Sequence, residues 1–317
     1  MANSIVLGSS GVLRPGALLW LRSLAWAAAL FVGVVAAGAL AAGLAHVVGG
    51  AFTRVPLEMA TRQALPPVDF VATSLLGLGI LAAYVGLVRL GERRLPSELD
   101  LNFLTRELPI GLALGAAMMA AAVLLLWAGG WVVVGRREVT GAWEAVGLSI
   151  QSGVGEEVVF RLVVLRLMWR AFGPWAALAF SAFVFGALHL TNPNSSWFAA
   201  ICIMIEAGIM LAGFYILTGR LWVSIGVHAG WNFTQGWIFG AAVSGTSGFG
   251  GGPLSVEPLA GVPEILSGGG FGPEASLSGL FVGTAVGALT LWLAWQRGRF
   301  VADGEGTARS RPRPALP

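Results

Sequence analysis

The sequence has no lysine and a single cysteine, and only 11% of its residues are charged. One cysteine excludes an intrachain disulfide and any metal site built from several cysteines. Soluble domains carry about a quarter charged residues, whereas this chain of 317 residues is 56% hydrophobic with a mean hydropathy of +0.79. Its composition therefore predicts an integral membrane protein.

Apolar stretches long enough to cross a bilayer recur along the whole sequence. A helix needs about 20 residues to cross the hydrocarbon core, and about eight stretches qualify. We expect spans at residues 24–45, 69–88, 110–131, 144–168, 174–190, 197–218, 221–242 and 276–296. The predicted fold class is all-α, a polytopic membrane protein with about eight transmembrane helices in one bundle.

One bundle accounts for most of the chain, because no segment of soluble character is long enough to bury a core of its own. We expect an N-terminal cytoplasmic segment at 1–16, the helical bundle at 17–296 with its motif core at 144–242, and a disordered basic tail at 297–317. The insertion at 243–275 carries two glycine-rich runs. It is expected to be an external loop, and its role stays open.

The distribution of the arginines predicts the orientation in the membrane. Loops rich in basic residues face the cytoplasm, and most arginines outside the spans fall on one side, against only Arg54, Arg62, Arg136 and Arg137 on the other. Both termini are therefore predicted to be cytoplasmic, and the charged segment 89–109 is expected to lie along that interface. Arginines spread over membrane borders form no basic face for nucleic acid, so we expect no nucleic-acid partner.

The predicted span 144–168 contains the sequence GEEVVFR. Glu157 and Arg161 are four residues apart and can form an ion pair on one helix face, which predicts structural support, because an unpaired buried arginine is strongly destabilising. Glu156 points about 100° away from them. Without a local partner it is a candidate general base or acid. The alternative is that both glutamates pair with arginines and serve structure alone.

Two of the three histidines fall within spans, on different helices. His189 ends the sequence FGALH, with Phe185 one turn before it. His228 and Asn232 are one turn apart in HAGWN, where they can direct two donors at one point, as stabilising an oxyanion requires. A lone buried histidine is often only a satisfied donor, but this combination with Glu156 indicates one site. Because Arg220 lies close before His228, the span at 221–242 must begin below the membrane surface or tilt.

These residues resemble three motifs of the CAAX protease and bacteriocin-processing family, intramembrane proteases that include the type II CAAX prenyl endopeptidases such as the Ras-converting enzyme. GEEVVFR resembles EExxxR, FGALH resembles FxxxH and HAGWN resembles HxxxN, in the family's order over residues 156–232. The resemblance implies an endopeptidase in which Glu156 and His189 activate a water molecule, while His228 and Asn232 form an oxyanion hole. The flanking sequences NPN, TGRLW and GGGFGPEAS resemble bacterial members, which implies a prokaryotic inner or plasma membrane.

A glutamate and two histidines are also a common zinc ligand set, and the family has been labelled metalloprotease for that reason. A zinc site of Glu156, His189 and His228 is therefore the alternative. The preferred prediction is a glutamic mechanism without a cofactor, because Asn232 suits an oxyanion donor better than a zinc ligand.

Other functions stay open beside proteolysis of a protein or peptide substrate in the lipid bilayer. One is a non-catalytic binding or scaffold role, such as bacteriocin immunity. Another is transport, since Glu and His within helices can relay protons, although we find no repeated halves of the kind many transporters have. The sequence leaves open the substrate, whether it is prenylated, the oligomeric state and the role of Glu206.

Overall fold

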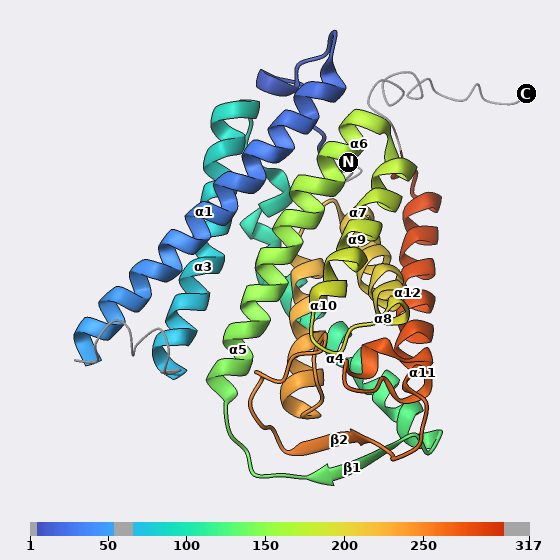
Figure 1. Cartoon of the computed structure of the whole chain (residues 1–317). Coiled ribbons are helices and arrows are strands. Elements are labelled where there is room, and N and C mark those ends of the chain that lie inside the picture. Colours follow the sequence, from blue (N-terminus) through green and yellow to red (C-terminus); the bar gives the residue numbers. More distant parts are fainter. Residues whose placement is uncertain (1–4, 54–65, 301–317) are drawn as a thin grey trace, which may run out of the picture.

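The chain forms a helical bundle in the computed structural model, which describes residues 5–53 and 66–300 (Figure 1). Within these residues six helical stretches are long and apolar enough to cross a membrane: Leu19–Ala51, Val68–Glu92, Ser97–Ala128, Pro174–Thr191, Trp197–Thr218 and Leu277–Gln296. This confirms a polytopic, mainly helical membrane protein.

The spans predicted at 144–168 and 221–242 are helical but are not among these six. The first lies in a continuous helical run from α5 (Ala142–Ile150) to α6 (Arg166–Phe172). The second is α10 (Trp222–Phe233), extended by a π-helical turn at Thr234–Ile238. The helical run at 144–168 differs from the six apolar helices because it carries charged motif residues. The helix at 221–242 differs from them because it is short. The total of eight crossings therefore stays a prediction.

The remaining helices are α1 (Leu19–Thr53), α3 (Pro66–Leu87), α4 (Leu104–Ala128), α7 (Pro174–Leu188), α8 (Trp197–Ile203), α9 (Met210–Thr218), α11 (Glu264–Ser267) and α12 (Leu277–Gln296). A π-helical turn at Met204–Ile209 joins α8 to α9. The start of α1 and the end of α12 lie at the same end of the bundle (Figure 1). An even number of crossings requires this arrangement.

Two short strands accompany the helices of this all-α fold. β1 (Val132–Arg136) pairs antiparallel with β2 (Leu254–Pro258), and Val134 lies opposite Val256. The run of three valines from Val132 favours an extended conformation, because β-branched side chains suit strands. The ribbon lies at the end of the bundle opposite to the start of α1 (Figure 1). It ties the insertion at 243–275 to the end of α4, so the described insertion is a folded part of the protein.

Glycines bring α10 unusually close to α4. Gly111 and Gly115 of α4 face Gly226 and Gly230 of α10, which gives each helix one GxxxG pattern. A Cβ atom on Gly115 would lie 2.1 Å from the carbonyl oxygen of Val227, so the two backbones are in contact. Small residues at this spacing are a common packing device between membrane helices. The contact fixes the helix that carries HAGWN.

The segment 89–109 is partly buried inside the bundle, and its location along the membrane interface stays a prediction. Glu92 and Glu98 are fully buried. Arg94 joins them, with its Nε atom 2.7 Å from Glu92 and its Nη2 atom 2.7 Å from Glu98. Arg166 also binds Glu92, at 2.6 Å. Two acids matched by two arginines can be buried because each charge has a close partner.

The predicted disordered tail, 297–317, lies mostly outside the described residues. Of its described part, the ring of Phe300 stacks on Trp175 at 4.7 Å between centroids and on Trp169 at 5.7 Å. At the other terminus, Leu7 and Leu13 are buried in the bundle core.

Candidate active site

The GEEVVFR sequence lies on the helical run between α5 and α6, where the helix is wound as π-helix on both sides of Glu157. These turns span Gln151–Glu156 and Val158–Leu165. π-helical turns occur often at functional sites. Glu157 and Arg161 are fully buried and form the ion pair that their spacing predicts, with 3.0 Å between Oε2 and Nε. The Glu156 side chain is 37% exposed and lines a cavity.

His228 joins this helix to α10. Its Nδ1 atom lies 3.1 Å from Oε1 of Glu157, and its Nε2 atom lies 4.0 Å from Oε2 of Glu156. The carboxylate of Glu157 accepts a hydrogen bond, so Nδ1 carries a proton and the Nε2 atom is left facing Glu156. Glu157 thus binds Arg161 and His228 together, and this second contact was not predicted from the sequence.

The helix that carries His228 begins beside Arg220, which is held inside the bundle. The side chain of Arg220 is only 12% exposed and its Nε atom lies 2.8 Å from Oε1 of Glu107 on α4. The next residue, Leu221, is fully buried and its backbone N–H donates to the carbonyl of Glu98. The helix α10 therefore begins inside the bundle, and its depth relative to the membrane surface stays a prediction.

His189 follows the last turn of α7 and is positioned by Phe185. Its Nδ1 atom lies 2.7 Å from the carbonyl oxygen of Phe185, and the two rings stack with centroids 4.9 Å apart. A carbonyl only accepts, so Nδ1 is the donor and the Nε2 atom of a neutral His189 is an acceptor. Phe185 also contacts His228 edge to face at 6.3 Å and lies under the guanidinium of Arg161 at 5.2 Å. Phe185 therefore packs against His189, His228 and Arg161 together.

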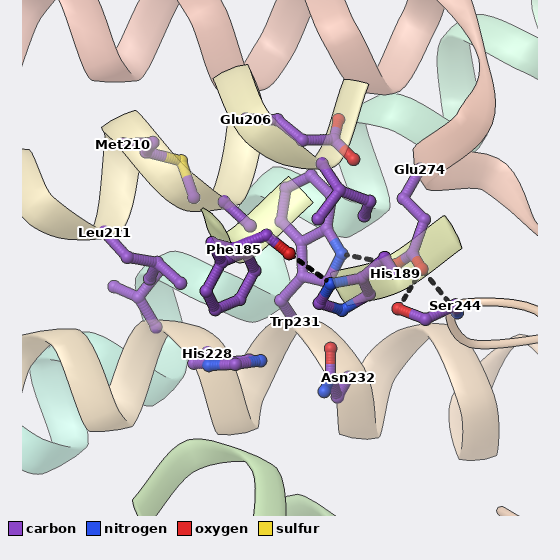
Figure 2. Close-up of a pocket in the computed structure, with 13 residues that line it drawn as sticks. Phe185, His189, Glu206, Met210, Leu211, His228, Trp231, Asn232, Ser244 and Glu274 are labelled. Carbon is purple, nitrogen blue, oxygen red and sulfur yellow. Dashed lines mark hydrogen bonds between the residues drawn. The ribbon is translucent and has the colours of Figure 1, made fainter. Parts of the chain in front are cut away.

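Asn232 lies one turn beyond His228 and faces the same space. Figure 2 shows both side chains on one side of α10, facing the ring of His189. The Nδ2 atom of Asn232 donates to Oγ of Ser152 at 2.9 Å. An amide nitrogen has two protons, so one N–H is left for a ligand. Ser152 lies four residues before Glu156 on the same helix, a spacing that could have identified it in the sequence.

One cavity of about 630 Å³ brings all four predicted residues together. Glu156, His189, His228 and Asn232 all line it. The residues that α1 and α3 contribute to its lining are all apolar, namely Phe31, Val35, Ala39, Leu76 and Ile80. Within the described residues no hydrogen bond links His189 to Glu156, whose nearest imidazole is that of His228. The site thus combines a carboxylate, two imidazoles and an amide beside an apolar wall.

A second acidic group lies behind the histidines, and of its two members the sequence analysis singled out Glu206 but not Glu274. A small cavity of about 30 Å³, large enough for one water molecule, is lined by Glu206 and Glu274 together with His189. Glu274 accepts hydrogen bonds from the Oγ atom of Ser244 at 2.6 Å, from the backbone N–H of the same residue, and from Trp231 Nε1 at 3.4 Å (Figure 2). Burial raises the pKa of Glu274. No spacing in the sequence connects this loop residue to HAGWN.

Glu206 occupies the π-helical turn between α8 and α9. Its side chain is 1% exposed, and neither carboxylate oxygen has a hydrogen-bond partner among the described residues. Gly279 and Gly283 of α12 leave room for it, since a Cβ atom on Gly283 would lie 2.2 Å from the Cβ of Glu206. Glu206 therefore lies against α12 behind the site, outside the larger cavity.

The donor atoms do not form a metal site as they stand. In the residues that the structure describes, no group of three or more His, Cys, Asp or Glu side chains could hold a metal ion. The alternative zinc set of Glu156, His189 and His228 is therefore not arranged as a metal site in the described residues. The single cysteine, Cys202, is buried in α8, and His46 binds Asp69 at 3.1 Å near the far end of α1.

The comparisons with known proteins assign the part of the chain that contains this site. Residues 138–234 match the family model described as type II CAAX prenyl endopeptidase Rce1-like. This confirms the family resemblance predicted from the three motifs, all of which lie within the matched segment. Neither the curated proteins nor the solved structures give a match to the chain.

Proposed function

We propose, on the premise that residues 138–234 form an Rce1-like type II CAAX prenyl endopeptidase domain, that this chain is an intramembrane endopeptidase acting on membrane-associated or lipidated proteins. The observation that carries the proposal is the single cavity lined by Glu156, His189, His228 and Asn232. These are the residues that match the three motifs of the family.

Glu156 is the proposed general base. Its partial exposure to the cavity leaves the carboxylate accessible to water, whereas Glu157 is buried and occupied by Arg161 and His228. The 4.0 Å separation between Glu156 and His228 Nε2 is too long for a direct hydrogen bond, and a water molecule can contact both groups. His189, whose Nε2 atom is an acceptor, completes the surroundings of this water.

The proposed reaction is hydrolysis by this water molecule. Glu156 takes a proton from the water while the water oxygen bonds to the carbonyl carbon of the substrate. The carbonyl oxygen becomes an oxyanion. Asn232 Nδ2–H donates to the oxyanion, and so does Nε2–H of His228 when its ring is cationic. The C–N bond then breaks as the protonated Glu156 returns the proton to the leaving amine.

The shape of the cavity supports an apolar or lipid-attached substrate. The candidate catalytic residues come from the helices that carry the three motifs, whereas α1 and α3 contribute an apolar wall. A peptide carrying a lipid or a hydrophobic segment can place that part against the wall while its peptide bond reaches Glu156. The proposal leaves the identity of the apolar group open.

We further propose that both termini face the cytoplasm. The start of α1 and the end of α12 lie at one end of the bundle (Figure 1), where Arg14, Arg22 and Arg297 flank them. The positive-inside rule supports a cytoplasmic location for this end. The test is a reporter fused after Phe300 that is active only outside the cytoplasm. Activity of this reporter would contradict the proposed orientation.

Comparison of membrane proteomes tests the function. Cells carrying the wild-type chain, Glu156→Ala or the control Glu138→Ala are compared for new protein termini, Glu138 being an exposed glutamate outside the cavity. We expect a set of termini that disappears with Glu156→Ala and persists with Glu138→Ala, at equal protein levels. Identical termini in all three strains would refute proteolysis and favour a binding or scaffold role.

A further inference from the structure

A second large cavity lies where α1 begins, far from the candidate active site. It has a volume of about 610 Å³ and contains three arginines, Arg14, Arg22 and Arg93, together with Trp26 and Leu90. Among the described residues that line it, none is acidic. The two cavities share none of their described lining residues. The proposed catalytic reaction therefore does not account for this cavity.

The three arginines are not neutralised by the protein. Within the described part of the chain, none of them forms an ion pair. Glu92, the sequence neighbour of Arg93, is fully buried and is already bound by Arg94 and Arg166. Trp26 Nε1 also donates to Glu92, at 2.9 Å. The positive charge of the cavity is therefore available to an external anion.

The walls of the cavity are held in place. Gly11 packs so closely on the backbone of Gly91 that a Cβ atom would lie 1.9 Å from the carbonyl oxygen. The guanidinium of Arg22 donates to the carbonyl of Arg14 at 2.8 Å. Arg93 has a left-handed backbone with φ of 54°, a conformation that is uncommon for a residue with a side chain. These contacts hold the backbone around the cavity and the guanidinium of Arg22 in place before any ligand arrives.

The residues around the cavity are typical of the level of the lipid headgroups. Arg22 and Trp26 are one turn apart near the start of α1, and arginine and tryptophan together mark the membrane interface. Leu90, which is 79% exposed, adds an apolar side chain at the rim. Guanidinium groups match phosphate oxygens in charge and geometry. A molecule with a phosphate group and apolar chains therefore fits both parts of the cavity.

We infer that this cavity binds the phosphate group of an anionic membrane lipid through Arg14, Arg22 and Arg93. A free phosphate offers the same oxyanion chemistry, but only the lipid also uses the apolar rim at Leu90. The site is independent of the proposed proteolysis, and its occupation does not require the residues of the larger cavity.

Lipid titration of the purified full-length chain tests this inference. Native mass spectrometry counts the phosphatidylglycerol and phosphatidylcholine molecules retained, and a parallel arm adds inorganic phosphate as a competitor. The test variant combines Arg14→Gln with Arg93→Asn, since asparagine tolerates a left-handed backbone and Arg22 has a backbone role. The charge-matched control combines Arg106→Gln with Arg297→Gln, two exposed arginines outside the cavity.

We expect selective retention of phosphatidylglycerol, weakened by roughly tenfold in the test variant, since each arginine near an anionic surface contributes a few-fold to binding. The control should keep wild-type affinity. Displacement of phosphatidylglycerol by millimolar inorganic phosphate would assign the cavity to a soluble phosphate and would overturn the lipid assignment. Equal lipid binding by the wild type and the test variant, with both folded by thermal unfolding, would overturn the inference. If the double variant does not fold, Arg14→Gln alone provides the same comparison.

Discussion

The imidazole of His228 is hydrogen bonded to Glu157, with 3.1 Å between Nδ1 and Oε1. Glu157 also binds Arg161, so one buried carboxylate serves an ion pair on its own helix and orients a side chain of α10. The second glutamate of GEEVVFR therefore links two of the three motifs. We treat it as a positioning residue, because it lies outside the larger cavity while His228 lines it.

Substitution of Glu157 by Gln should impair both stability and cleavage. Leaving Arg161 without its buried partner costs about 3 to 5 kcal/mol of unfolding free energy. Loss of a group that orients a reacting side chain lowers the rate by roughly 10- to 100-fold. Unfolding and single-turnover cleavage in detergent measure the two effects.

The double variant Glu157→Leu with Arg161→Met separates these effects. Replacing a buried ion pair with apolar side chains is often neutral for stability, so we expect recovered unfolding free energy. The cleavage rate should stay low, because His228 still lacks its acceptor. Recovery of both properties would mean that Glu157 acts on stability alone.

Stability should depend on the ionisation of Glu274. Burial raises the pKa of this carboxyl from its ordinary value of 4.5, so the folded chain holds the proton more tightly than the unfolded chain does. The free energy of unfolding therefore falls as the pH rises from the ordinary pKa through the raised one. Glu274→Gln should remove this part of the pH dependence.

Thermal unfolding between roughly pH 4 and 8 measures the dependence on Glu274. The matched control is Glu264→Gln, an exposed glutamate of the same insertion. We expect the control to follow the wild type and Glu274→Gln to show a flatter profile. Superimposable profiles for all three proteins would show that Glu274 has the same pKa in both states.

The contact between α4 and α10 should be intolerant of a single added methyl group. The Cβ atom in Gly115→Ala would lie 2.1 Å from the backbone oxygen of Val227, so the helices must separate. We expect a loss of about 1 to 3 kcal/mol in unfolding free energy, as for other overpacked sites, and slower cleavage because α10 carries His228. Gly43→Ala is the control, since no atom lies within 4 Å of its added Cβ. An unchanged Gly115→Ala protein would contradict the close packing.

Cleavage should survive removal of metal ions. We propose the metal-free mechanism because Glu156 and Asn232 suit a base and an oxyanion donor. Purified protein is analysed for metals and assayed with and without a chelator. Activity should persist at substoichiometric zinc. Stoichiometric zinc that leaves together with activity, and restores activity when returned, would assign the site to zinc chemistry.

Local spacing in the sequence was enough to predict the Glu157–Arg161 pair and the shared face of His228 and Asn232, because contacts one turn apart follow from helix geometry. Apolar length was enough to locate the six long helices. Contacts between distant segments could not be predicted in this way. The approach of Glu274 to Trp231 depends on how the insertion folds, and the β1–β2 ribbon joins segments about 120 residues apart.

The sequence also gave no direct indication of the π-helical turns around Glu157. The GxxxG spacings of α4 and α10 were present in the sequence, but which helices they join is known only from the fold. The sequence therefore predicted the candidate site residues one by one. How these residues are placed relative to one another depends on tertiary contacts.

The most direct test of the account is hydrolysis of a quenched fluorescent, lipid-anchored peptide library by purified protein in liposomes, with Glu156→Gln compared with the wild type. Glutamine keeps the size of the side chain but cannot accept the proton of the attacking water. The account predicts cleavage by the wild type and a rate lower by at least about 100-fold for Glu156→Gln, in the range of general-base catalysis, with unchanged thermal unfolding. Equal cleavage rates for the two folded proteins would contradict the central claim that Glu156 activates water in this cavity.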